Sequence, residues 1–167
     1  ILFETVKNGQ TTMPELANKI ANVTSIAANS GVSFVELSAA IAAITSTGLP
    51  TSETITSLKQ VISNIIKPTS QAADMAEKLG IGFSAEALRA EGLKGVLDNV
   101  KEATGGNTTQ MTKLFGSVEA LNGVMALTGE GAEKFTSTLK EMEEFSGSLS
   151  TAYGKMADDI KNKLQTL

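Results

Sequence analysis

Apolar residues recur every three or four positions along most of the chain, in groups that polar residues, glycines and prolines separate. This spacing places the apolar side chains of each group on one face of a helix, and no segment has a clear β-hairpin signal. Helices are predicted over residues 12–30, 33–47, 51–67, 69–79, 84–90, 92–103, 107–115, 118–127 and 135–145. The pattern therefore predicts an all-α fold, a compact irregular bundle of about seven to nine short helices, and leaves open an extended C-terminal helix.

Three of the predicted helices begin with a capping box, in which two side chains three residues apart each bond the other residue's backbone N–H. The boxes are Thr12–Glu15, Ser33–Glu36 and Asn107–Gln110. In the second box we expect Ser33 to accept from a free backbone N–H and Glu36 to reach back to the start of its own helix. The helix at 51–67 is expected to begin with Thr51 or Ser52, and the next with Thr69 or Ser70.

Glycine and proline indicate where the helices end. Glycine adopts the left-handed conformation of a helix C-cap without a Cβ clash, and proline cannot continue a helix. The predicted stops are Gly31, Gly48, Pro50, Pro68, Gly80, Gly105, Gly106, Gly129 and Gly147. Because these stops recur at short intervals, we expect the chain to fold back on itself rather than form one rod.

The segment at 33–47 is the smoothest of the predicted helices, with Glu36 as its one charged residue. Its apolar stripe, Leu37, Ile41 and Ile44, is surrounded by alanines at positions 39, 40, 42 and 43. Alanine lets neighbouring backbones approach closely from several sides. We therefore predict that this helix lies at the centre of the bundle.

No low-complexity linker divides the chain, so one compact domain is the simplest interpretation. Residues 12–147 are predicted to form this compact helical core, after a frayed N-terminal end at residues 1–11. Residue 1 is isoleucine, so we expect a piece of a longer polypeptide. Residues 148–167 are predicted to form a C-terminal helix leading towards a rod. Its apolar positions, Leu149, Met156, Ile160 and Leu164, leave packing on the domain and the start of a coiled coil equally open.

The composition also favours closely packed helices, since 41% of the residues are apolar but only 4% are aromatic. Charged residues make up 19%, which leaves room for burial of surface in self-association. A net charge of −4 indicates no specific nucleic-acid partner. The absence of cysteine and histidine excludes disulfides, the usual zinc sites and the commonest general base near neutral pH. The longest weakly polar run, residues 37–49, is too short to span a bilayer.

Two acidic clusters are the first candidates for chemistry: Glu141, Glu143 and Glu144 form one, and Asp158 and Asp159 the other. Paired carboxylates serve glycoside hydrolysis. Here lysines are interleaved with both clusters, and charges of mixed sign on a helix face are typical of a solvated surface. We therefore interpret both clusters as surface.

Two further patterns are candidate binding sites. The stretch ATGGNTT at residues 103–109 has the glycines of a phosphate-binding loop, but it lacks the lysine–hydroxyl signature and a preceding strand, so we interpret it as a helix–helix joint. The six methionines mostly fall on apolar stripes, which favours core filling over a methionine-rich groove. No catalytic, cofactor-binding or metal-binding residue is predicted, and no cofactor; the chain is predicted not to be an enzyme.

A series of short motifs gives the chain a family resemblance. SGVS, TGLP, KPTSQAA, LGI and LFGSVEALNG follow one another between residues 30 and 123. In this order they resemble the core region of tail tape measure proteins of long-tailed bacteriophages and prophages. The final AYGKMADDIKNKLQTL is similar to the family's exit from that core into a long helical rod. These motifs define helix caps and joints, so they indicate the fold more directly than any site.

The resemblance implies a structural virion protein in the lumen of the phage tail, and in the host cytoplasm during assembly. It implies a part in setting tail length and in templating the tail tube, with the tail tube protein, tail assembly chaperones and baseplate proteins as partners. The ruler of this family is helix rise, about 1.5 Å per residue of continuous helix. A chain with so many stops is then expected to be a compact module attached to the ruler.

Two other functions stay open at this point. One is a helical adaptor that binds tail chaperones or baseplate proteins through an exposed apolar groove. The other is a membrane-active segment that contacts the host membrane on ejection. A cell-wall hydrolase is the weakest alternative, because nothing in the sequence resembles the site of such an enzyme.

Overall fold

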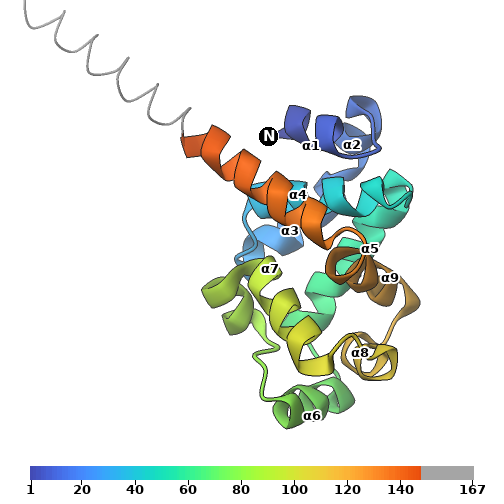
Figure 1. The fold of residues 1–167 in the computed structure, drawn as a ribbon, viewed down its shortest axis with the longest axis vertical. Helices are drawn as coiled ribbons and strands as arrows, with labels where there is room; N and C mark the ends of the chain where they lie inside the picture. The colour runs from blue at the N-terminus through green and yellow to red at the C-terminus, as the bar shows by residue number, and fades with distance from the viewer. Residues whose placement is uncertain (148–167) are drawn as a thin grey trace, which may run out of the picture.

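The fold is built from short helices joined by tight turns, as the computed structural model shows for the part of the chain that it describes, residues 1–147 (Figure 1). The helices are α1 Leu2–Asn8, α2 Met13–Lys19, α3 Ala21–Ser30, α4 Phe34–Ser46, α5 Thr51–Ile66, α6 Ser70–Leu79, α7 Ala85–Thr104, α8 Thr108–Phe115 and α9 Val118–Thr128. A further helix begins at residue 132 and continues to residue 147. No strand occurs within residues 1–147. The predicted all-α class and compact bundle are confirmed.

Helix α4 lies at the centre, as predicted. Every residue from Glu36 to Thr45 is buried, and α4 contacts α1, α3, α5, α7 and α9. The four alanines of the segment have no exposed surface, so neighbouring helices pack directly against its backbone. A helix that is apolar all round is expected to be buried all round.

Among α1 to α9, helices α5 and α9 form the most extensive pair, and a glycine lies at their contact. A Cβ atom on Gly123 of α9 would lie 3.1 Å from Cβ of Ser57 and 3.2 Å from Cγ2 of Val61, both on α5. Only small residues allow two helix backbones to approach this closely. The lower end of the bundle in Figure 1 is made by α6 and α8. The rings of Phe83 and Phe115 pack edge to face, with 5.3 Å between ring centroids and 75° between ring planes.

Side-chain caps fix the starts of most of these helices. Hydroxyl or amide oxygens accept a hydrogen bond from the backbone N–H three residues later at Thr12, Ser33, Thr69, Ser84, Asn107 and Ser117. Each bond satisfies a donor that the first turn of a helix leaves free. Helix α5 begins at Thr51, as predicted, but it has no side-chain cap. The Thr51 hydroxyl instead bonds the Thr11 hydroxyl, with 2.6 Å between the two oxygens.

The predicted break in the segment at 84–103 is also confirmed. Helix α7 contains one residue with a non-helical conformation, Gly92, with φ 72° and ψ 176°. The predicted helix at 12–30 differs more from the structure, because it divides into α2 and α3. Ile20 between them keeps helical torsion angles, φ −59° and ψ −32°. The Val23 N–H donates to the Ile20 carbonyl at 3.1 Å, so a tighter turn marks the boundary.

The first eleven residues differ from the frayed end that we expected. Residues 2–8 form α1, which packs on α4. A Cβ atom on Gly9 would lie 2.4 Å from Oγ1 of Thr45 and 3.0 Å from Cα of Ala42, so the absence of a side chain lets the segment lie against α4. The Gln10 backbone N–H also donates to Oγ1 of Thr45, at 3.2 Å. The proposed domain boundaries stay a prediction.

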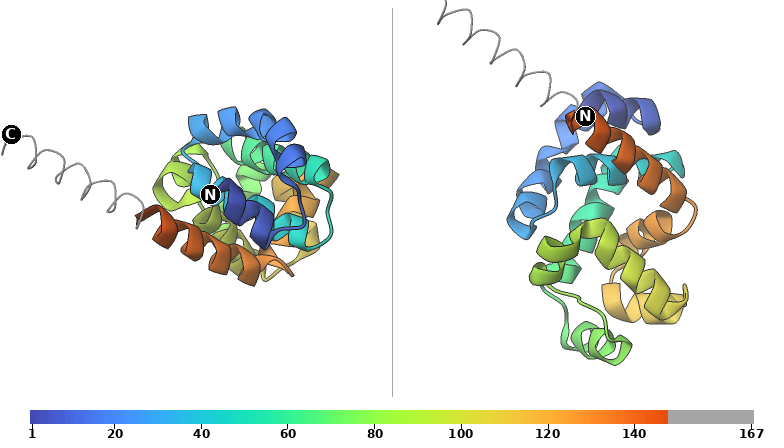
Figure 2. Two further views of the ribbon diagram at one scale, coloured as in Figure 1. Left: turned by 90° about the horizontal axis from the view of Figure 1, so that it is seen from above. Right: turned by 60° about the vertical axis from the view of Figure 1, so that its left-hand side comes forward.

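Helix α1 also lies beside the last described helix. Lys134 donates from Nζ to Oδ1 of Asn8 at 2.9 Å, and Asn8 donates from Nδ2 to Oε2 of Glu141 at 3.3 Å. In Figure 1 and in the right view of Figure 2, residue 1 and the end of the helix at residue 147 lie at the same end of the molecule. The predicted C-terminal helix at 148–167 lies outside the described residues.

Candidate functional site

The acidic residues offer no assembled reaction centre in the part of the chain that the structure describes. Glu141, Glu143 and Glu144 are all exposed on the helix at 132–147, and Glu141 accepts a hydrogen bond from Asn8. Across residues 1–147, no three histidine, cysteine or acidic residues lie together in a way that could hold a metal ion. Asp158 and Asp159 lie outside the described residues. The first cluster therefore lies on the surface, as predicted.

Two exposed groups have clearly shifted pKa values, and both shifts come from contacts within one helical turn. The pKa of Lys7 is raised by its hydrogen bond to the Glu4 carboxylate. The pKa of Glu86 is lowered by a hydrogen bond from its own backbone N–H and by another with Ser84, the N-cap of α7. Contacts between side chains so close in sequence are typical of exposed helix ends rather than of a catalytic pocket.

The glycine-rich stretch at residues 103–109 is a helix–helix joint, as predicted. Thr104 ends α7, Gly105 and Gly106 follow with φ 57° and 79°, and Asn107 caps α8. The positive φ angles reverse the chain between the two helices, which explains the two glycines without a ligand.

The Glu36 side chain makes a partly buried polar contact with a different partner from the one predicted. Its side chain accepts the Lys94 backbone N–H at 2.7 Å, and a Cβ atom on Gly92 would lie 2.8 Å from the same Oε1. The carboxylate thus caps the second half of α7, where the backbone restarts as a helix after Gly92. Ser33 accepts from the Glu36 N–H at 3.0 Å, so half of the predicted box is present. This contact joins two helices and has no feature of a reactive group.

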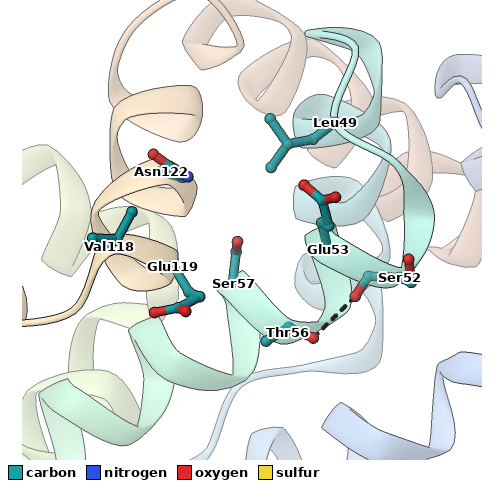
Figure 3. Close-up of a pocket in the computed structure, with 8 residues that line it drawn as sticks. All are labelled: Leu49, Ser52, Glu53, Thr56, Ser57, Val118, Glu119 and Asn122. Carbon is teal, nitrogen blue, oxygen red and sulfur yellow. Dashed lines mark hydrogen bonds between the residues drawn. The ribbon is translucent and has the colours of Figure 1, made fainter.

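A surface feature with exposed apolar side chains runs between α5 and α9 (Figure 3). Two adjoining hollows share Leu49 and Asn122 in their walls. We call the combined feature the α5–α9 groove and define it by the lining residues Leu49, Ser57, Val118, Asn122 and Met125, with Glu53, Glu119 and Glu130 on its rim. Figure 3 shows Leu49 and Ser57 facing its interior from α5 and the turn before it, opposite Val118 and Asn122 of α9.

Two side chains of α9 in this groove were expected in the core. Val118 is 71% exposed and Met125 is 41% exposed, whereas Val124 and Leu127 are buried. Helix α9 carries apolar residues on more than one face, so the pattern alone could not show which face packs against α5. Core filling is confirmed for Met111 and Met142 but is wrong for Met13 and Met125.

The described residues define a compact all-α bundle. Residues 1–116 match the family described as phage-related minor tail protein. Since this match covers more than half of the 167 residues, the chain belongs to the phage-related minor tail protein family. It is therefore a structural protein of phage tails.

Two curated proteins are similar to the chain. A probable tape measure protein of Clostridium phage phiCD119 is 29% identical over 175 residues, which cover 100% of this chain and 18% of the relative. The tape measure protein of Pneumococcus phage Dp-1 is 25% identical over 158 residues, which cover 92% of this chain and 14% of the relative. The chain thus spans less than a fifth of the length of either relative. The resemblance to tape measure proteins is confirmed, and no solved structure matches the chain.

Proposed function

We propose that the chain is a compact module of a tail tape measure protein, which helps to set tail length and to template assembly of the tail tube. The observation that carries the proposal is the match over the whole of this chain to less than a fifth of a much longer tape measure protein. The remaining length of such a protein is available for an extended ruler. This chain's helices fold back on each other around α4 instead.

The division of labour within such a protein follows from helix geometry. A continuous helix extends about 1.5 Å per residue, so only an uninterrupted segment converts residue number into length. In residues 1–147 the longest helix, α7, has 20 residues and is itself broken at Gly92. We propose that residues 12–147 form the module and that residues 148–167 lead towards the ruler.

The tail context indicates contacts with other tail proteins. We propose the tail tube protein, the tail assembly chaperones and the baseplate proteins as partners, with the module in the host cytoplasm during assembly and in the tail lumen afterwards. Within residues 1–147, no helix is both long enough and apolar enough to cross a bilayer.

The proposal is tested by measuring tail length in the phage or prophage that encodes the chain. A continuous helical insertion of about 20 residues in a helical region outside this chain should lengthen the tail by about 30 Å. The same number of residues inserted as a flexible loop at Gly82, between α6 and α7, should leave the length unchanged. Equal lengthening by both insertions would show that the bundle is extended in the tail and would overturn the proposal.

A further inference from the structure

The α5–α9 groove combines exposed apolar side chains with one sign of charge. Val118, Asn122 and Met125 follow at intervals of four and three residues, so they lie on one face of α9. That face is turned away from the core, since Val118 and Met125 are among the most exposed large apolar residues in residues 1–147. Leu49, in the turn before α5, is half-buried and lines both hollows.

The bottom of the groove is set by the close contact of the two helices. Gly123 on the inner side of α9 lies against Ser57, and Ser57 is only 3% exposed. The walls rise on either side of this contact, from Glu53 on α5 and from Glu119 and Asn122 on α9 (Figure 3). A depression between two nearly touching helices is the shape in which a third helix can lay a narrow apolar stripe.

The charge of the rim is unbalanced. Glu53, Glu119 and Glu130 are exposed. None of their three side-chain carboxylates has an ion pair or a side-chain hydrogen bond among the described residues. No lysine or arginine lines either hollow. Elsewhere on the surface carboxylates do pair within their own helix, as Glu4 does with Lys7 and Asp98 with Lys94. The groove therefore favours a cationic partner over a neutral or acidic one.

From this combination we propose that the α5–α9 groove binds a helix of a partner protein that carries a stripe of apolar side chains flanked by lysine or arginine. The apolar stripe covers Val118, Met125 and Leu49, and the basic flanks lie against Glu53, Glu119 and Glu130. This proposal goes beyond the proposed function and does not rest on it, because it uses only the shape and charge of this surface. Its failure leaves the tape measure proposal untouched.

The experiment titrates the 167-residue chain with three synthetic helical peptides of about five turns each. The first has a leucine stripe flanked by lysines, the second keeps the leucines but has glutamates in the flanks, and the third keeps the lysines but has serines in the stripe. Nuclear magnetic resonance locates the contact from shifts of backbone amides, and fluorescence anisotropy gives the affinity. We expect saturable binding of the first peptide, with shifts confined to Leu49 and the groove-facing residues of α5 and α9. The other two peptides should bind at least about tenfold more weakly.

Variants of the chain make the charge argument specific. The combined Glu53→Lys, Glu119→Lys and Glu130→Lys variant should reverse the preference, so that the glutamate-flanked peptide binds more tightly. Glu143→Lys changes an equally exposed carboxylate outside the groove and should leave the preference as it is. Val118→Asp should weaken binding of the first peptide, and circular dichroism should show an unchanged fold because Val118 is 71% exposed.

Four outcomes of the peptide titrations would overturn the proposal. They are the absence of binding, equal affinity for lysine and glutamate flanks, shifts that map to another surface, and a reversal variant that keeps the original preference. Concentration-dependent shifts of the groove residues in the chain alone would also overturn it, because a second copy of this chain would then be the occupant.

Discussion

At the scale of single residues, polar side chains join helices that are distant in the sequence. Glu36 belongs to α4 but caps the second half of α7, 58 positions further along the chain. Asn8 joins α1 to the helix at 132–147 through both polar atoms of its side chain, Oδ1 and Nδ2. Such contacts specify which helices lie beside each other, whereas the apolar side chains of the core mostly fill space.

Removal of the Glu36 carboxylate should destabilise the fold. Glu36→Ala leaves the Lys94 N–H without its acceptor in a partly buried site, and a lost hydrogen bond to a charged group costs about 1.5–3 kcal/mol. Glu36→Gln should cost less, because the amide oxygen still accepts from Lys94. Urea unfolding at neutral pH measures both changes in the free energy of unfolding.

The matched control for this prediction is Glu77→Gln on α6, where the carboxylate is exposed. It should change the free energy of unfolding by no more than about 0.5 kcal/mol. A Glu36→Ala variant as stable as this control would show that the contact with Lys94 makes no net contribution.

At the scale of helices, the break in α7 depends on a residue pair rather than on glycine alone. Gly92 has φ 72° and ψ 176°, a region that residues with a side chain almost never occupy. The Glu36 carboxylate fills the space beside it. A straight α7 would remove both the turn and the free N–H that Glu36 caps.

Gly92→Ala should therefore cost more than alanine at an ordinary helix end. We expect a loss of about 2–4 kcal/mol, from the backbone conformation and from displacement of Glu36. Gly80→Ala is the comparison at an ordinary helix end, because Gly80 has the left-handed conformation, φ 67° and ψ 30°, in open space, and it should cost about 1 kcal/mol. Equilibrium unfolding in urea gives both values.

A double-mutant cycle then separates the two contributions at Gly92. If Glu36 and Gly92 are coupled, Gly92→Ala should cost less in the Glu36→Ala background than in the original chain. Additive costs would contradict the coupling and would leave backbone strain as the sole effect.

The sequence could predict those features of the helices that depend on residues within one or two turns. The caps at Thr12, Ser33 and Asn107 and the break at Gly92 are of this kind, and so is the burial of the alanine-rich α4. Helix α1 was missed because seven residues are too few to show a period, and because its support comes from Thr45 and Ala42 on another helix.

The α5–α9 groove shows the same limit for the candidate site. An apolar stripe on α9 could be predicted, but the face that packs on α5 is decided by Gly123 against Ser57, a contact between distant segments. The exposure of Val118 and Met125 follows from that choice of face. The acidic rim likewise comes from two helices and a turn that only the fold brings together.

At the scale of the whole molecule, α1 closes the bundle by contacting both the central helix and the last described helix. Its hydrogen bonds to Lys134 and Glu141 lie at a surface and are few in number. Helices α4 and α5 are held instead by fully buried apolar side chains, among them Ile41 and Leu58. Opening of the bundle is therefore expected to begin at α1.

Asn8→Ala should loosen this attachment without unfolding the core. Hydrogen exchange followed by mass spectrometry should show faster exchange in peptides from residues 1–11 and 132–147, and unchanged exchange in peptides from α4 and α5. Asn99→Ala, which removes a surface contact with Glu91 on α7, is the matched control and should leave α1 unchanged. Uniform acceleration across all peptides in the Asn8 variant would mean that α1 opens only when the whole bundle unfolds.

The neighbouring positions of residue 1 and residue 147 have a consequence for any longer polypeptide that contains this bundle. A polypeptide that enters the bundle at residue 1 and leaves it at residue 147 enters and leaves at the same end of the bundle. The intervening residues therefore add mass but little end-to-end length. The bundle then contributes little to the length of the extended polypeptide. Any length that such a polypeptide sets is determined by the segments on either side of the bundle.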